Sequence, residues 1–196
     1  MNMHIFQVKS NGTFPETGNI LIASPLLNDY HFARSVILMI DNNEGGSMGV
    51  VLNKKFKYRL TLDRLLPELE GIDPIPIYKG GPMDRNTIFF VHLFKDLEGA
   101  LNLGNGLYLN GDFEAIKEYI RKGEPVEGKI RFYAGYAGWE KGQLKKEIRE
   151  DSWITGNITP PQLMQSPSQL LWEECLASLG SPYTLWAKYP QYPSFN

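Results

Sequence analysis

The feature that most constrains this chain is a glycine-rich turn at residues 45–49, which read Gly-Gly-Ser-Met-Gly. The pattern G-x-S-x-G is typical of serine hydrolases, in which the nucleophilic serine stands between a strand and a helix. Here Ser47 is followed by Gly49 and by two β-branched valines, which are poor residues for a first helical turn. We therefore expect the turn to lead into a strand that ends at Asn53, and not into a helix.

The composition indicates one ordinary globular domain. The chain has 196 residues, of which 42% are hydrophobic and 21% charged, and this length is enough to bury a core. We expect a domain over residues 1–180 and a tail rich in proline and aromatic residues over 181–196. The longest apolar runs, such as residues 36–40, have strand length and are too short to span a bilayer.

The compartment and the partners follow from charge and cysteine usage. No secretory signal is recognisable at the N-terminus, and Cys175 is the single cysteine, so the sequence predicts a cytoplasmic protein with no internal disulfide and no membrane association. The net charge is −2 and the basic residues are scattered among acids, which argues against direct contact with nucleic acid. A small molecule or another protein remains as the expected partner, and the sequence leaves the oligomeric state open.

No cofactor or metal is expected from the motifs. His4, His31 and His92 lie far apart and lack the spacing of metal ligands. The Gly-Asn-Gly segment at 104–106 lacks the third glycine of a dinucleotide-binding motif and is interpreted as a turn.

Hydrophobic periodicity predicts an α+β fold. Apolar positions recur at helical spacing over residues 112–121, where Asp112 stands at the N-terminus and Gly123 follows the end. Strands and helices interleave irregularly, which favours a mixed sheet with helices packed against it. The expected strands are 19–23, 35–40, 49–53, 75–78, 87–92 and 129–136, the last ending at Gly135; the expected helices are 60–66, 112–121, 139–150 and 168–179, the last capped by Ser168.

Two polar residues allow alternative interpretations. Ser47 and His92, with Asp63, Asp73 or Asp84 as the acid, would have the chain order of a hydrolase triad, but aspartates are too common for this match to carry weight. His92 at a strand end is more simply a buried histidine with hydrogen-bond partners. Asn53 closes an apolar strand, so its amide either ties down the backbone of the 45–49 turn or is presented to a ligand.

Several segments identify the chain with a known family. Residues 18–25 and 46–53, then 80–83 with His92, follow the order found in the YqgE/AlgH family of bacterial proteins, which the chain resembles over about residues 18–180. The other matching positions are Phe32, residues 34–36, 135–139 and 142–144, Glu147, Trp153 and residues 171–172. The resemblance implies a single α+β domain whose bifurcated, coiled sheet forms a partial barrel. It implies no established chemistry, although one member is named as a transcriptional regulator of alginate synthesis.

The chain departs from the family pattern in the glycine turn. The family commonly has a small apolar residue at the position of Ser47, which argues further against a nucleophile. It also often has a histidine near Asn42 and a proline at the position of Lys55. These differences argue against a histidine-based role for the turn.

We therefore expect a non-catalytic binding or regulatory module, with a serine hydrolase using Ser47 and His92 as the alternative. Glycine turns allow close approach of backbone to backbone or ligand, and the planar guanidinium of Arg34 suits an anion. We expect one cleft that gathers Ser24, Arg34, Gly46, Ser47, Gly49, Asn53, Gly80, Gly81, His92, Gly135 and Gln143.

Overall fold

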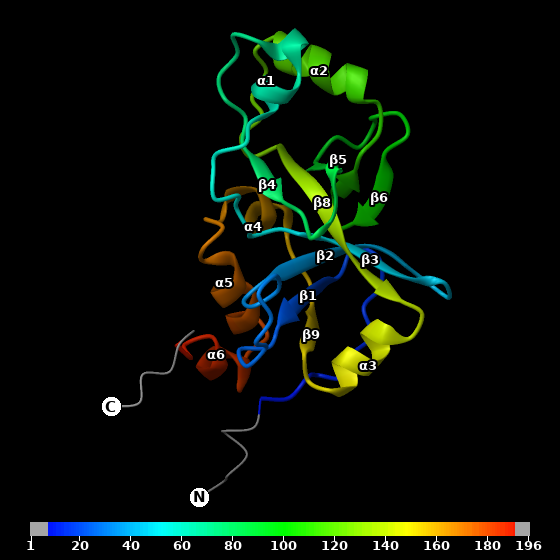
Figure 1. Cartoon of the computed structure of the whole chain (residues 1–196), viewed down its shortest axis with the longest axis vertical. Helices are drawn as coiled ribbons and strands as arrows, with labels where there is room; N and C mark the ends of the chain where they lie inside the picture. Colours follow the sequence, from blue (N-terminus) through cyan, green and yellow to red (C-terminus); the bar gives the residue numbers. More distant parts are fainter. Residues whose placement is uncertain (1–7, 191–196) are drawn as a thin grey trace, which may run out of the picture.

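The structure is a computed structural model that describes residues 8–190 (Figure 1). His4 and residues 191–196 of the expected tail lie outside the described residues. The strands are β1 (Ile20–Ala23), β2 (Val36–Asn43), β3 (Gly46–Val51), β4 (Ile77–Lys79), β5 (Met83–His92), β6 (Leu101–Gly104), β7 (Leu107–Leu109), β8 (Ile130–Glu140) and β9 (Trp153–Gly156). The helices are α1 (Leu62–Leu65), the 3-10 turn η2 (Pro67–Leu69), α2 (Phe113–Arg121), α3 (Gln143–Arg149), α4 (Pro160–Gln165), α5 (Leu171–Ala177) and α6 (Tyr183–Trp186).

The strands form one nine-stranded sheet in the order β6-β7-β5-β8-β3-β2-β1-β9, with β4 paired to β8 off this path. Neighbours along the path are antiparallel, whereas β4 runs parallel to β8. The sheet does not close into a barrel, and helices cover it, which confirms the predicted α+β class. None of the helices in the described part of the chain has the length and apolar character that a membrane crossing requires.

The long strand β8 belongs to two half-sheets. Its residues 130–136 pair with β5, and its residues 137–140 pair with β3. The β4 strand occupies the edge of β8 at 132–134. Figure 1 shows the two half-sheets turned against each other along β8. Where they diverge, the N–H of Val51 donates to the carbonyl of Gly80 over 2.7 Å, and the N–H of Gly80 donates to the carbonyl of Ala134 over 2.8 Å.

Three glycines allow the segment that connects β4 to β5 to cross β8 in close contact with its backbone. A Cβ atom on Gly80 would lie 2.2 Å from the Gly135 oxygen, and one on Gly81 would lie 2.0 Å from the Tyr136 oxygen. Gly135 has a φ of +77°, and a Cβ there would lie 2.6 Å from the Met83 oxygen. Backbone contacts backbone at these positions, so any side chain would force the two segments apart.

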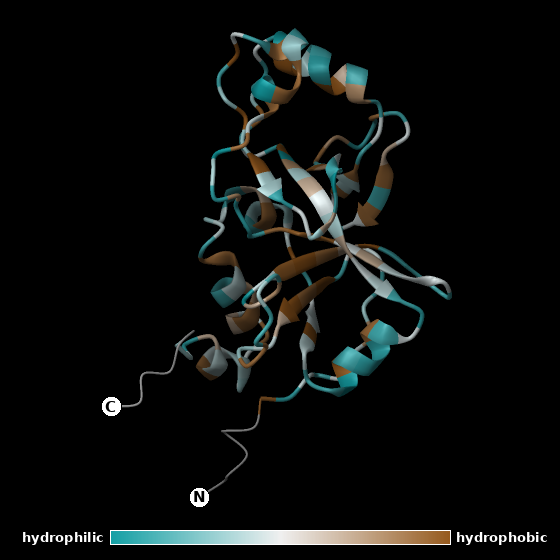
Figure 2. Cartoon of the chain, viewed as in Figure 1, coloured by the Kyte–Doolittle hydropathy of each residue, from teal (hydrophilic) through white to brown (hydrophobic). Residues whose placement is uncertain are grey.

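Strands β1 and β2 are buried on both faces. All four residues of β1 and the first five of β2 are buried, and Figure 2 shows both strands as predominantly hydrophobic. Leu144 and Ile148 of α3 pack on one face with Trp153. On the other face, α5 contributes Trp172, whose indole N–H donates to the Ala23 carbonyl over 2.8 Å. Continuous apolar strands therefore lie in the middle of a layered structure.

The predicted strand over 49–53 is confirmed in type, but it begins earlier, at Gly46, and ends at Val51, before Asn53. Only Glu44 and Gly45 form the turn itself. Other predicted boundaries are also wrong. The last predicted strand does not end at Gly135, because the left-handed conformation of this glycine bends β8 without breaking its pairing, and the strand continues to Glu140. Consequently Trp139 lies in a strand, and the helix predicted over 139–150 begins only at Gln143.

The C-terminal half contains elements that periodicity did not predict. The strands β6, β7 and β9 have three or four residues each, too few to establish an alternating pattern. Helix α4 does carry a sequence signal, a capping box in which the Thr159 hydroxyl accepts from the Gln162 N–H. Ser168 does not cap α5, which begins after Leu170. In the expected tail, α6 packs its Trp186 into the main core.

Gly135→Ala is expected to lower the free energy of unfolding by about 3 kcal/mol or more, because it combines a positive φ with a clash against backbone. Gly123→Ala is the matched control: its φ is +76°, but a Cβ there meets nothing within 4 Å. That variant should cost only about 1–2 kcal/mol. Urea unfolding of both variants measures the difference, and equal losses would contradict the crossing geometry.

Candidate functional site

The candidate site is a groove with a volume of about 810 Å³ between three loops. One wall is the segment before β4, residues 72–76. A second wall is the connection from α2 to β8, residues 123–128, and a third is the connection from α4 to α5, residues 165–169. The groove is therefore built by segments that are far apart in the sequence and that meet beside β8.

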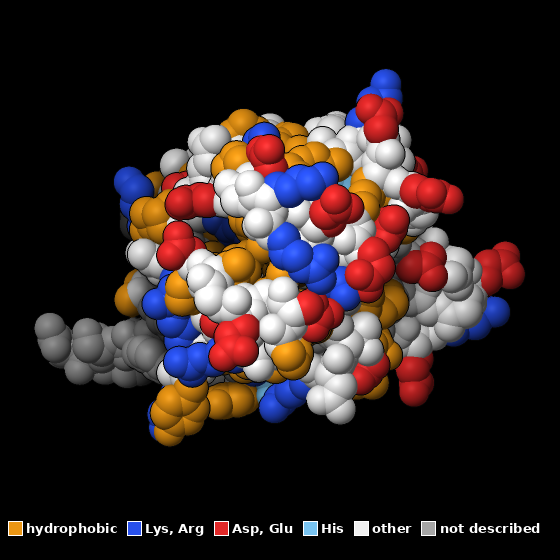
Figure 3. All heavy atoms as spheres, turned by 90° about the horizontal axis from the view of Figure 1, so that it is seen from above, with side chains coloured by type: hydrophobic (Ala, Val, Ile, Leu, Met, Phe, Trp, Pro, Cys, Tyr) orange, Lys and Arg blue, Asp and Glu red, His pale blue; other side chains and the backbone are white. Residues whose placement is uncertain are grey.

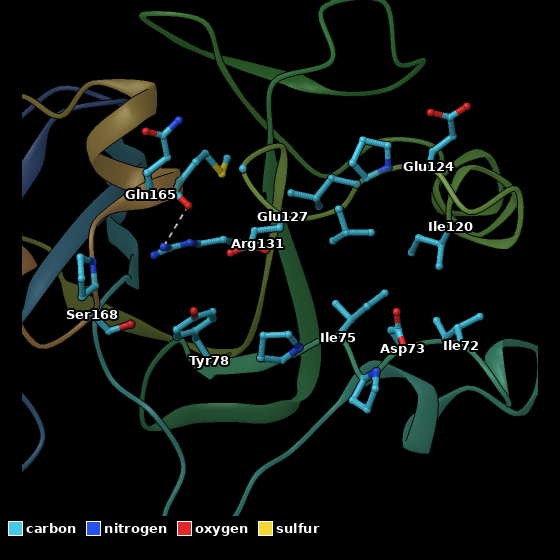
Figure 4. A pocket seen from close by; sticks show the side chains of 18 of the residues that line it. Ile72, Asp73, Ile75, Tyr78, Ile120, Glu124, Glu127, Arg131, Gln165 and Ser168 are labelled. Carbon is cyan, nitrogen blue, oxygen red and sulfur yellow. Dashed lines mark hydrogen bonds between the residues drawn. The ribbon is translucent and has the colours of Figure 1, made fainter.

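The groove carries charged side chains along its length. Figure 4 shows Arg131, Tyr78, Gln165 and Ser168 toward one end, with Glu127 labelled beside Arg131, and Asp73 and Glu124 toward the other end. Apolar side chains lie between and around them, among them Ile72, Ile75 and Ile120. Lys55 and Arg121 also line the groove, so a ligand lying along it would meet an apolar lining and charged groups of both signs.

Arg131 is fixed in the groove. Its Nη2 donates to the carbonyls of Met164 and Ser166 over 3.1 and 3.2 Å, and its guanidinium lies 5.2 Å from the centroid of the Tyr78 ring. These contacts join β8, β4 and the α4–α5 connection. The guanidinium is held in place without a carboxylate partner, since no salt bridge to Arg131 occurs among residues 8–190.

None of the eleven residues predicted to form a cleft lines this groove. Gly80, Gly81 and Gly135 meet at the strand crossing described above. Ser24 is buried at the end of β1, where its N–H donates to the Ser152 carbonyl over 2.9 Å. Gly49 lies within the sheet, where a Cβ would be 2.5 Å from Ile37 Cγ2. Direct ligand contact by these residues stays a prediction.

Arg34 and Asn53 are brought together. The Asn53 amide donates to the Arg34 carbonyl over 2.8 Å and accepts from the Val36 N–H over 2.9 Å. Asn53 thus secures the start of β2 and not the 45–49 turn that we expected. The Arg34 guanidinium lies 4.3 Å from the centroid of the Trp172 ring and donates to the Tyr189 carbonyl, and burial lowers its pKa although Glu173 raises it.

Gly46, Ser47 and Gln143 lie near the end of β8. A Cβ on Gly46 would be 2.5 Å from the Trp139 oxygen, and Ser47 pairs with Trp139. The Gln143 side chain accepts from the Glu140 N–H over 3.0 Å and donates to Glu147 over 2.8 Å. The same Glu147 carboxylate accepts the indole N–H groups of Trp139 and Trp153 over 2.9 and 2.7 Å. These tryptophans are core residues with satisfied donors.

The hydrolase pair is not assembled. Ser47 is half-buried, and its Oγ donates to Asn42 Oδ1 over 2.7 Å. Its partner on β8 is Trp139, whereas the partner of His92 is Ile130. Nine residues of β8 separate these partners, which corresponds to about 30 Å at the rise of a strand.

His92 is a buried structural histidine, as the simpler interpretation predicted. Its side chain is 0% exposed. Nε2 lies 2.8 Å from the Asn110 carbonyl and must donate to it, and Nδ1 accepts from the Phe94 N–H over 3.1 Å. Burial lowers the pKa of His92, although the bond to Asn110 raises it. The imidazole is therefore held neutral in one tautomer.

The cysteine thiol and the potential metal ligands also form no reactive site. Cys175 is buried, and burial raises its pKa to about 12, so its thiol is not an activated nucleophile. In residues 8–190, no three His, Cys, Asp or Glu side chains are grouped so as to hold a metal ion.

Comparisons of sequence agree with one another. A family model described as AlgH-like matches residues 20–184. A Bacteroides fragilis protein, named only as a UPF0301 protein, is 45% identical over 196 residues, which cover 100% of this chain and 99% of that protein. A Bacteroides thetaiotaomicron protein with the same kind of name is 43% identical over 192 residues, 98% of this chain and 97% of the relative.

Two solved structures share the fold. A crystal structure of a Corynebacterium diphtheriae protein has a TM-score of 0.75 at 26% identity and covers 90% of this chain and 94% of its own. The solution structure of the AlgH protein from Pseudomonas aeruginosa has a TM-score of 0.66 at 28% identity and covers 92% and 98%, respectively.

Acidification should destabilise the protein through His92. Because the folded-state pKa lies below the unfolded value of about 6.5, the unfolded chain binds more protons between these two values. The free energy of unfolding should fall as the pH drops below about 6.5, by at most about 1.4 kcal/mol per pH unit from this residue. NMR titration of the His92 ring gives the direct measurement, and a midpoint above 6.5 would contradict it.

Ser47 should not react as a nucleophile, because its hydroxyl donates to an amide oxygen and has no imidazole beside it. We expect a fluorophosphonate probe to label the wild type and Ser47→Ala equally. Labelling that disappears only in Ser47→Ala would restore the hydrolase interpretation.

Proposed function

Because this chain belongs to the AlgH-like family, whose members matched above carry no stated activity, we propose that it is a non-catalytic binding module whose ligand occupies the groove beside β8. One observation carries the proposal: the groove combines an apolar lining with the fixed cation of Arg131 and with further charged side chains of both signs. The family resemblance inferred from the sequence is confirmed by these matches.

The dimensions of the groove support a ligand the size of a short peptide or a cofactor-sized molecule. Ligand sites in proteins commonly measure about 300–1,000 Å³ and combine apolar walls with a few fixed polar groups. The groove meets both conditions, with about 810 Å³ and with Arg131 held by two carbonyl acceptors. The fixed guanidinium of Arg131 favours a ligand that carries an anionic or acceptor group.

A binding role is favoured over catalysis because the groove lacks an arranged reactive pair. Its lining contains no histidine and no cysteine. Ser166 and Ser168 line it, but no imidazole or amine is paired with either in the described contacts. Activated nucleophiles require an adjacent base, so the groove favours recognition.

A regulatory role is the finer form of the same proposal. A binding module changes the behaviour of its partner when the ligand is present, which is compatible with the regulator name that one family member carries. We place this activity in the cytoplasm, as the sequence predicts from its single cysteine.

Val126→Arg is expected to abolish ligand binding, because Val126 lines the groove and a long cation there would fill it. Leu65→Arg is the matched control: Leu65 is 45% exposed on α1 and does not line the groove. Native mass spectrometry of each protein, purified from its own cells, detects a bound small molecule or peptide by mass. Wild type and Leu65→Arg should carry it, and retention by folded Val126→Arg would contradict the proposal.

A further inference from the structure

Three basic side chains without a carboxylate partner, Lys54, Lys79 and Arg85, lie near one another outside the groove. Lys54 and Lys79 lie on neighbouring segments, since the Lys79 N–H donates to the Lys54 carbonyl over 2.9 Å. Arg85 lies beyond the crossing on β5, close enough for its charge to act on Lys79. The salt bridges found in residues 8–190 involve Lys117, Lys122 and Lys146 and none of these three cations.

The positive charges of these side chains repel one another, which contributes to lowering the pKa values of both lysines. Burial lowers the pKa of Lys54, and the charges of Lys79 and Arg34 lower it further. Burial also lowers the pKa of Lys79, with Arg85 as the second cause. Unrelieved repulsion of this kind leaves a positive field that an anionic partner would neutralise.

The loop of residues 24–34 places an aromatic side chain beside Lys79 and carries a second exposed apolar side chain. Tyr30 is 93% exposed, and Lys79 Nζ lies 6.0 Å from the centroid of its ring. Leu26 on the same loop is 65% exposed. The one acid of the loop, Asp29, is engaged, because its carboxylate accepts the N–H groups of His31 and Phe32 over 2.7 and 2.9 Å. Large exposed apolar side chains next to unpaired cations are typical of protein interfaces.

We propose that Leu26, Tyr30, Lys54, Lys79 and Arg85 form a docking surface for an acidic protein segment that carries an apolar or aromatic anchor. Carboxylates of the segment would pair with Lys79 and Arg85, while Lys54, whose ammonium donates to the Ala33 carbonyl, adds to the positive field. The anchor of the segment would pack against Tyr30 and Leu26. Exposed tyrosine and arginine are the residue types that most often dominate binding energy at such contacts.

A protein segment fits this surface better than a nucleic acid does. Nucleic acids bind proteins largely through many cation–phosphate contacts, whereas this surface offers three cations. Figure 3 shows acidic and basic side chains interspersed over the face that it presents, with hydrophobic side chains among them. The exposed Tyr30 ring can pack against an apolar anchor or against a base, so an oligonucleotide is included in the test below.

The docking surface is separate from the groove. None of its five residues lines the groove, although Lys55 and Tyr78, the neighbours of Lys54 and Lys79, do. The proposal therefore stands without the groove ligand, and groove variants such as Val126→Arg should leave it intact.

The test uses a fluorescein-labelled peptide of Glu and Asp residues with one central Phe, titrated with the full-length protein and followed by fluorescence anisotropy. The double variant Lys79→Glu/Arg85→Glu should weaken binding at least about tenfold, because two attractive contacts become repulsive. Tyr30→Ala should weaken it about fivefold or more. Binding to the wild type should also weaken as the salt concentration rises.

Matched controls make the result decisive. Lys141→Glu/Lys145→Glu changes the net charge by the same amount on and beside α3 and should bind like the wild type. Equal weakening by both double variants would overturn the proposal, because only overall charge would then matter. Absence of peptide binding at low salt would also overturn it, and so would tighter binding of a single-stranded oligothymidylate of equal charge.

Discussion

The architecture depends on one close contact between two backbone segments, at the strand crossing. Gly80, Gly81 and Gly135 let two chain segments touch without side chains between them, and only because of this contact can β8 pair with β5 along one part and with β3 along another. The divergence of the two half-sheets creates separate spaces for α3, for α5 and for α2. The groove lies where these separated layers leave the loops beside β8 uncovered.

Much of the framework was predictable from the sequence because it depends on local patterns. Continuous apolar runs predicted β1 and β2, and Asp112 with a single apolar face predicted α2, whose cap is formed as expected. The chain beyond the glycine turn is extended because Gly49 and the valines after it disfavour a helix. The prediction failed at Gly135, where a glycine that usually ends a strand bends it instead.

The groove was not predictable in the same way. Its walls come from residues 72–76, 123–128 and 165–169, and nothing in any one of these segments indicates the other two. The residues selected from the sequence were polar or glycine residues beside apolar strands. Several of them serve the scaffold: Asn53 bonds the start of β2, and Gln143 bonds a carboxylate that also holds two indoles. The sequence alone does not distinguish a polar side chain that hydrogen-bonds to the scaffold from one that binds a ligand.

The loop that carries Tyr30 is attached at both ends. At its beginning, the N–H of Ser24 is bonded to Ser152. At its end, the Ala33 carbonyl accepts the Lys54 ammonium, and the Arg34 carbonyl accepts the Asn53 amide. Most of the configurational freedom of the loop is therefore removed during folding. When such a rigid platform associates with another molecule, the entropy loss falls mainly on that molecule, so stiffening the incoming segment should strengthen the complex more than altering the loop.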